Sequence, residues 1–256
     1  MGWFVQSAQA LLRKFEHAAR LSAAEKAELC RLVSYQKIVP PRHDLPMSDA
    51  ADVHFLLDGM ASRYIILADG RRVLLGFLLP GDFCDLHPQL APVFAHPIIS
   101  ISACSVAHYP RRALAAWRGE FPALATALER WCLVDGAITR RWLTNMAIPA
   151  EYRLAHLLCE LRTRLAQVGQ ADEASFPLFL TQQEMGEAIA ISTVHINRSL
   201  QHLKELGLVR VMNHRVFIPD LARLESFVGF DSAYLEPGGG AFSRNSSAAA
   251  DSPIQG

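Results

Sequence analysis

The sequence predicts an α+β fold, in which an antiparallel β-domain precedes a long helix and a small winged helical domain. Three observations lead to this prediction. Short β-rich runs separated by turn signals fill residues 38–109, an apolar repeat at helical spacing fills residues 121–146, and two short helical patterns followed by a hairpin pattern fill residues 180–218. At about 150 residues per domain, a chain of 256 residues has room for one or two domains.

Composition places the chain among globular proteins. Apolar residues make up 51% and charged residues 20%, which excludes a largely disordered chain. The 25 basic and 25 acidic side chains balance, so any nucleic acid must be bound by a local patch. No apolar run approaches the ~18 residues that a membrane helix needs, and no signal peptide is evident. We therefore expect a cytoplasmic protein without a membrane partner.

The first segment, to about residue 33, is expected to form two helices. Leu11, Leu12 and Phe15 recur at helical spacing, and Ser22 begins the sequence SAAE, which is a capping-box pattern. The chain then contains the runs VHFLLDG, SRYIILADG, RRVLLGFLL and PIISISACSVAHY, with Asp-Gly and Pro-Gly signals between them. Turn signals at this spacing predict an antiparallel sandwich or barrel.

A long helix is expected over residues 121–146. One stripe of this helix steps by four and three residues, which is the spacing of a coiled-coil seam, so we expect a homodimer interface there. The alternative is a core helix packed on its own domain, which the apolar residues Leu133, Val134 and Leu143 outside the stripe favour. The expected interface stripe comprises Leu124, Leu128, Trp131, Asp135, Ile138, Trp142 and Asn145.

Two features delimit the remainder of the chain. Pro149 disfavours helix at the preceding residue and predicts a hinge, after which a further amphipathic helix ends near Gly169. From Asp231 onward the chain is rich in Gly, Ser and Ala, and we expect a disordered tail over residues 231–256.

The most informative stretch is LTQQEMGEAIAISTVHINRSLQHLKELGLVRVMNHRVFI, residues 180–218. Thr181 followed by Glu184 is a capping box for a short helix, and Ser192 is the expected N-cap of a second helix. Two short helices joined by a tight turn, the second with a polar outer face, are typical of a DNA-reading helix-turn-helix. The alternating run that follows, centred on an Asn-His pair, predicts a β-hairpin wing.

The outer face of the second helix has the chemistry to read bases. Arg198 can offer two donors to guanine O6 and N7, and Asn197 can pair with adenine. Val194 or the Thr193 methyl group can touch a thymine methyl. The expected DNA-binding residues are Ser192, Thr193, Val194, His195, Asn197, Arg198, Gln201 and Arg215.

Within that set, Ser192, His195 and Arg215 are better placed for phosphate contacts, which position the helix without reading sequence. Residues 181–218 hold four basic and three acidic side chains, a net charge of only +1. Specific binding should therefore depend on base readout more than on charge. The alternative is a generic helical subdomain with a solvated polar face.

The stretch TQQEMGEAIAISTVHINRSLQHLKELGLV resembles the helix-turn-helix of the Crp/Fnr family of bacterial transcription regulators. The order of domains is similar to that family over about residues 21–230, and LADGRR, PGDFCDLH and AHLLCEL resemble an alphaproteobacterial branch. The resemblance implies a helical lead-in and a β-roll of the cyclic-nucleotide-binding type over residues 1–120. It further implies a dimerisation helix over 121–146 and a winged helix-turn-helix over 150–230 that binds promoter DNA as a homodimer.

The family's base-contacting positions fall on Thr193, Val194, Asn197 and Arg198, and Arg198 matches the family. Val194 departs from it, because many members place glutamate there to accept from cytosine N4, and valine cannot accept a hydrogen bond. We therefore expect the half-site to differ from the familiar family consensus at that base pair.

No cofactor or metal is expected. The family's nucleotide cassette uses a Gly-Glu pair for ribose and an Arg-Ser or Arg-Thr pair for the cyclic phosphate. This chain has PGDFCDLHPQL and AHPI in those places, so cyclic AMP binding is not expected. Only Cys30 precedes residue 80, which excludes an N-terminal iron-sulfur cluster, and no spacing singles out a haem ligand. Cys84 and His87 form a CxxH pair, but no second pair at zinc-ligand spacing accompanies it.

The chain is not expected to be an enzyme, because the GxSxG, HExxH, HxH and GxxxxGK[ST] motifs are absent. The alternative function is a β-roll module for protein interaction or small-ligand sensing that does not bind DNA. The sequence leaves open the identity of any small-molecule effector, and it marks no surface for RNA polymerase as a further partner.

Overall fold

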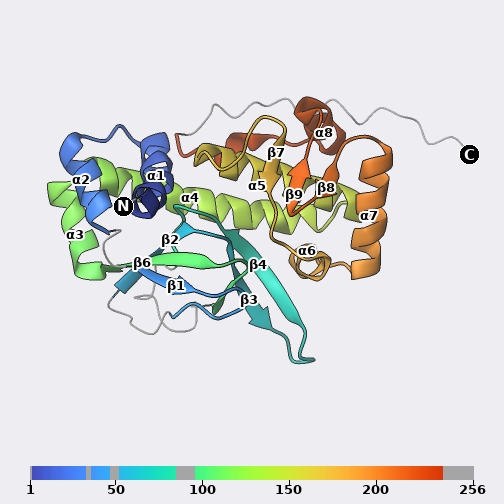
Figure 1. Cartoon of the computed structure of the whole chain (residues 1–256), viewed down its shortest axis with the longest axis horizontal. Coiled ribbons are helices and arrows are strands. Elements are labelled where there is room, and N and C mark those ends of the chain that lie inside the picture. The colour runs from blue at the N-terminus through green and yellow to red at the C-terminus, as the bar shows by residue number, and fades with distance from the viewer. Residues whose placement is uncertain (1, 33–35, 47–51, 85–95, 239–256) are drawn as a thin grey trace, which may run out of the picture.

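The computed structural model describes residues 2–32, 36–46, 52–84 and 96–238. Figure 1 shows a β-domain, formed by strands β1–β6, beside a long helix and a group of C-terminal helices. This arrangement confirms the predicted α+β fold. The elements are α1 (Gly2–Ala18), α2 (Ala23–Leu32), β1 (Gln36–Val39), β2 (Asp52–Asp58), β3 (Ala61–Ile66), β4 (Arg72–Leu78), β5 (Ile98–Ser100), β6 (Cys104–Pro110), α3 (Arg111–Glu120), α4 (Pro122–Asn145), α5 (Ala150–Gln167), β7 (Ser175–Pro177), α6 (Gln182–Ile189), α7 (Thr193–Glu205), β8 (Arg210–Met212), β9 (Arg215–Phe217), α8 (Leu221–Val228) and the 3₁₀ helix η3 (Ser232–Leu235).

The β-domain consists of two antiparallel sheets, as the turn spacing predicts. Their strand orders are β1-β6-β2 and β4-β3-β5. Buried apolar side chains from both sheets, among them Val39, Leu56, Leu78 and Val106, meet in one cluster. Strand alternation directs these residues inward, and this common core makes the two sheets a single scaffold.

The helical lead-in is part of the same core. Leu11 and Phe15 of α1 are fully buried, and the Phe15 ring lies edge-on to Trp117 of α3. Ser22 and Glu25 form the expected capping box, because the Ser22 N–H donates to the Glu25 carboxylate and the Glu25 N–H donates to Ser22 Oγ. The first helices therefore close one end of the β-domain (Figure 1).

Helix α4 packs on its own chain along the stripe that we expected to form the dimer seam. Leu124, Trp131 and Ile138 are buried in a cluster with α1 and the β-domain, and Leu128 packs against that cluster. The Trp131 indole N–H donates to the Lys14 carbonyl at 2.9 Å. The alternative of a core helix therefore holds for this face.

Two further members of the stripe, Asp135 and Trp142, are also engaged within the chain. Asp135 accepts a hydrogen bond from Arg63, and the Trp142 indole N–H donates to Glu160. The expected seam of Leu124, Leu128, Trp131, Asp135, Ile138 and Trp142 is thus corrected. The large apolar side chains that α4 exposes are Leu133 and Leu143, at 72% and 69%.

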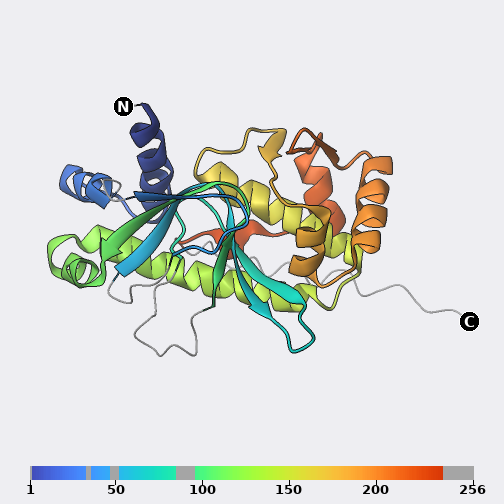
Figure 2. The same ribbon diagram turned by 60° about the horizontal axis from the view of Figure 1, so that its bottom comes forward.

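Helices α5 to α8 and strands β7 to β9 form a winged module. After α4 ends at Asn145, α5 begins directly after Pro149 and runs beside α4 in both views (Figures 1 and 2). The apolar cluster of this module, which includes Leu154 and Ile196, continues into the β-domain through Met60, Phe77 and Ile101. Strand β9 pairs with both β7 and β8 in a three-stranded antiparallel sheet.

The segment after residue 231 departs from the expected disordered tail. Asp231 caps η3, Leu235 is fully buried, and the Tyr234 hydroxyl donates to Glu160 at 2.9 Å. These apolar and aromatic side chains give residues 231–238 enough contact to be ordered, and residues 239–256 lie outside the described part. None of the described helices is long and apolar enough to cross a membrane.

Candidate nucleic-acid interface

The two helices α6 and α7 meet in a tight, fully capped turn. Thr181 Oγ1 accepts from the Glu184 N–H, while a Glu184 carboxylate oxygen accepts from the Thr181 N–H at 2.8 Å, so the predicted capping box is present. Helix α6 ends at Ala190, which adopts a left-handed φ of 55°. Ser192 then caps α7, as the sequence predicts. Short-range side-chain hydrogen bonds therefore fix the relative position of the two helices.

Gly186 lets the turn come close to α6. A Cβ atom on Gly186 would lie 2.5 Å from the carbonyl oxygen of Ile191, a separation that real Cβ atoms essentially never show. Backbone therefore touches backbone at this point, and α7 cannot move independently of α6.

Replacing Gly186 with alanine should lower the free energy of unfolding by about 1 to 3 kcal/mol, because the added methyl group overpacks a backbone contact. Gly119→Ala in α3 is the matched control. A Cβ there meets nothing within 4 Å, so that change should be neutral or stabilising. Urea unfolding of both variants measures the difference. Equal stability of Gly186→Ala and the wild type would contradict the close approach.

The outer face of α7 is exposed, while its inner face joins the module core. Ile196 and Leu203 are buried, Leu200 is partly buried, and Val194 is 58% exposed. Within the described residues, the Arg198 guanidinium makes no hydrogen bond or ion pair with the protein. The exposed side chains of this face are Thr193, Val194, His195, Asn197, Arg198 and Gln201. The helix therefore presents both bidentate readers, Arg198 and Asn197, to solvent.

Two polar residues occupy the N-terminal end of α7. Ser192 Oγ lies 2.9 Å from His195 Nδ1 and also accepts from the His195 backbone N–H. Both side chains are exposed. This arrangement keeps the imidazole beside the helix N-terminus, where unpaired backbone N–H groups and the helix dipole favour an anion such as phosphate.

The wing forms as predicted, but one of its arginines is already occupied. Asn213 and His214 both have positive φ, as a two-residue turn of type I′ requires. The Arg215 guanidinium donates to Asp172 at 3.1 Å and to Ser175 Oγ at 2.6 Å. These donors brace β9 against β7, and the expected phosphate contact of Arg215 stays a prediction. Arg210, on β8, is the exposed arginine of the wing.

A cavity of about 630 Å³ separates the β-domain from α4 and α6. Its walls are mostly apolar, with Val73, Leu75 and Trp142 among them, and Arg63 is the arginine on its described lining. That guanidinium is already paired with Asp135 at 3.0 Å and donates to the Phe83 carbonyl. The described walls therefore offer a cyclic phosphate no unpaired arginine.

The structure bears on the metal expectation only in part. Among the described residues, no three His, Cys, Asp or Glu side chains lie close enough to hold a metal ion. Cys84 is buried, whereas His87 lies outside the described residues. The structure therefore does not test whether Cys84 and His87 can bind a metal together.

A capped helix-turn-helix with an exposed reading face, a wing and an N-terminal β-domain defines a DNA-binding transcription regulator. Residues 152–227 match the Crp-like helix-turn-helix domain. The chain is 23% identical over 216 residues to the nitrogen fixation regulation protein FixK of Bradyrhizobium diazoefficiens, covering 84% of each chain. It is 25% identical over 220 residues to the transcriptional activator protein FnrL of Cereibacter sphaeroides, covering 84% of this chain and 88% of that one. The C-terminal module is thus a Crp-like helix-turn-helix domain, and the chain as a whole is similar to transcription regulators of the Crp/Fnr type.

The fold agrees with this assignment. The structure of FixK2 from Bradyrhizobium japonicum superposes with a TM-score of 0.62 at 21% identity, over 75% of this chain and 95% of that chain. The relatives are named as transcription regulators, which agrees with the expectation that the chain is not an enzyme.

Proposed function

We propose that the protein is a sequence-specific transcription regulator that binds a two-fold symmetric operator as a homodimer in the cytoplasm. The observation that supports this most is the exposed polar face of α7 on a rigid, capped turn. Relatives named as transcriptional activators support the same function. The alternative is a protein that senses ligands or binds other proteins through its β-domain and does not bind DNA. Such a protein would not need exposed Arg198 and Asn197 side chains on α7.

Each recognition residue has a defined role in this proposal. Arg198 donates to guanine O6 and N7, and Asn197 pairs with adenine N6 and N7. Val194, which is 58% exposed, touches a thymine methyl group where glutamate would accept from cytosine. Ser192 and His195 contact phosphate at the start of α7. Arg210, the exposed arginine on β8, adds a contact from the wing, since the donors of Arg215 are engaged with Asp172 and Ser175.

Selection of bound DNA from a random pool with purified protein tests this function. We expect a palindrome whose half-sites are centred about 10 base pairs apart and differ from the family consensus at the Val194 base pair. Recovery of unenriched sequences would overturn the function. Recovery of the unchanged consensus would overturn the role of Val194 alone.

We propose that the dimer forms through a stripe of α4 displaced by one residue from the stripe predicted by sequence. A step of one residue turns the face by about 100°, away from the core. The displaced positions keep heptad spacing and are partly or fully exposed. Gly136 and Cys132 are small enough for close helix approach, and Leu143 is 69% exposed. The proposed seam is Ala125, Glu129, Cys132, Gly136, Thr139, Leu143 and Met146.

Leu143→Glu is expected to weaken the dimer by at least about tenfold, because each interface would bury two carboxylates in place of two leucine side chains. Leu143 is exposed in the single chain, so folding should be retained. Sedimentation equilibrium measures the dimer dissociation constant. Ile38→Glu, which changes a 56%-exposed side chain on β1, is the control. An unaltered dimer in Leu143→Glu would exclude this seam.

We further propose that cyclic AMP does not control the protein. The paired state of Arg63 and the apolar walls of the 630 Å³ cavity support this, since a cyclic phosphate needs a charge-assisted partner. Any effector in this cavity would be largely apolar and would touch both the β-domain and α6. Two relatives are named as transcriptional activators. If this protein also activates transcription, we propose that it contacts RNA polymerase.

A further inference from the structure

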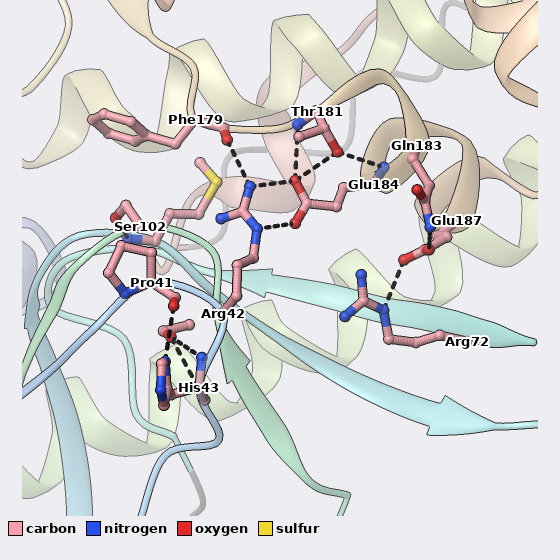
Figure 3. A network of polar contacts seen from close by, with 12 residues as sticks. Pro41, Arg42, His43, Arg72, Ser102, Phe179, Thr181, Gln183, Glu184 and Glu187 are labelled. Atoms are coloured by element: carbon pink, nitrogen blue, oxygen red, sulfur yellow. Dashed lines mark hydrogen bonds and ion pairs between the residues drawn. The ribbon is translucent and has the colours of Figure 1, made fainter.

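Two ion pairs join the β-domain to α6, the first helix of the helix-turn-helix (Figure 3). The Arg42 guanidinium binds both oxygens of the Glu184 carboxylate, at 2.8 Å and 2.9 Å, and that carboxylate is only 3% exposed. Arg72, at the start of β4, binds Glu187 at 2.8 Å, and both side chains are mostly buried. The two carboxylates lie one turn apart on the same face of α6, so the β-domain holds this helix at two points.

Arg42 projects from a rigid part of the β-domain. Its backbone has a left-handed φ of 63°, an uncommon conformation for a residue with a side chain. The Arg42 N–H donates to the Ser100 carbonyl at 2.8 Å, and the next N–H, of His43, donates to Ser100 Oγ at 2.9 Å. These bonds tie the turn to β5, so the guanidinium is presented from a fixed base.

The position of α6 determines the position of α7. The backbone contact between Gly186 and Ile191 and the caps at Thr181 and Ser192 make the two helices one unit. Arg42 and Arg72 therefore act on the recognition helix through α6, although neither residue lies on the exposed face of α7. The reading face itself remains open while the ion pairs are intact.

We propose that Arg42 and Arg72 are positioning residues that set the half-site spacing accepted by the dimer. The inference rests on the proposed function, because it requires two recognition helices that read one operator. Half-sites of such dimers lie about 34 Å apart, and one inserted base pair shifts one site by about 3.4 Å and turns it around the duplex. With both ion pairs intact, α6 and α7 keep one position relative to the β-domain and cannot follow this change. Without the pairs, α6 is free to shift together with α7.

The test compares binding of the wild type and the Arg42→Gln, Arg72→Gln double variant to two operators. One is the selected operator, and the other has one base pair inserted between its half-sites. The wild type should prefer the selected operator by about tenfold or more, and the double variant by about threefold or less. A merely structural role would weaken both complexes equally and leave this ratio unchanged, which would overturn the proposal.

Two further variants make the comparison specific. Arg71→Gln removes the same charge from the neighbouring residue, which pairs with Asp69 inside the hairpin, and should keep the wild-type ratio. The Arg72→Glu variant places two carboxylates together and should lose the preference for the selected operator spacing. Adding Glu187→Arg recreates the ion pair with reversed charges and should restore that preference. Failure of the reversed pair to restore discrimination would also contradict the proposal.

Hydrogen exchange separates this inference from the proposed function, because it needs no DNA. Amides of α6 should exchange about tenfold faster in the double variant than in the wild type, while those of α3 should not change. Suppose that the wild type binds no DNA specifically, but the amides of α6 exchange faster in the double variant. The proposed function would then be wrong, while the attachment of α6 to the β-domain by these ion pairs would be confirmed. Unchanged exchange in α6 would overturn the positioning role regardless of DNA binding.

Discussion

Replacing Asp82 with alanine is expected to lower the free energy of unfolding by about 3 to 5 kcal/mol, because it leaves the buried Lys14 ammonium without a counter-charge and removes one of the two carboxylates paired with Arg164. Asp82 lies between Lys14 of α1, at 2.5 Å, and Arg164 of α5, at 2.8 Å. It also accepts from the Leu79 N–H at 2.7 Å. Burial alone would raise the pKa of the Asp82 carboxyl, but the two cations hold that pKa at about 2.

The same network joins elements that lie far apart in the sequence. Arg164 also pairs with Glu160, which accepts from Trp142 of α4 and Tyr234 of η3. Burial raises the pKa of Glu160, although Arg164 opposes that change. Loss of Asp82 should therefore loosen the lead-in helix, the β-domain and the winged module together.

Urea unfolding of Asp82→Ala measures this stability loss. Asp69→Ala removes a carboxylate from an exposed ion pair with Arg71 and should leave the midpoint essentially unchanged, since exposed pairs contribute little. If the two variants lose equal stability, the buried network does not hold these elements together.

Arg198→Ala is expected to weaken operator binding by about 1 to 3 kcal/mol, or roughly 5-fold to 150-fold in Kd. The side chain is exposed and unpaired within the described residues, so its loss should not alter the fold. The expected cause is the loss of two hydrogen bonds to guanine. Fluorescence anisotropy titration at one fixed salt concentration measures the effect, since affinity for DNA depends strongly on salt.

Arg223→Ala is the matched control for charge. Arg223 is an exposed arginine on α8, and its removal lowers the net charge by the same amount. It should change operator affinity far less than Arg198→Ala. Equal losses in the two variants would mean that Arg198 acts only through charge and does not read a base.

The helix-turn-helix could be predicted from sequence because the interactions that form it are local. The capping box of Thr181 and Glu184, the Ser192 cap and the Asn213-His214 turn each involve residues at most three apart. Side-chain identity at such short range fixes the backbone conformation. Helix bounds and the exposed face of α7 then follow from the apolar spacing.

The face of α4 could not be chosen in the same way. Apolar periodicity predicts the helix and the stripe with Trp131, but it does not say whether that stripe packs on its own chain or on a second copy. What decides between these alternatives is α1, which covers the Trp131 face and accepts its indole hydrogen bond. That contact spans 117 residues, and spacing within one helix carries no information about it.

Long-range ion pairs could not be predicted either, because their partners lie far apart in the sequence. The pairing of Arg215 with Asp172, 43 residues earlier in the chain, was not predicted. Arg42 and Glu184 are 142 residues apart. Such pairs depend on how the β-domain and the winged module pack, which only the folded structure reveals.

The central claim is that α7 reads DNA sequence through its exposed side chains, and a binding profile tests it most directly. Kd values of the wild type and Arg198→Ala would be measured for every single base-pair change in the selected operator. We predict that Arg198→Ala loses discrimination at one symmetric pair of positions and keeps it at the others. A uniform loss of affinity, with the sequence profile unchanged, would contradict the account.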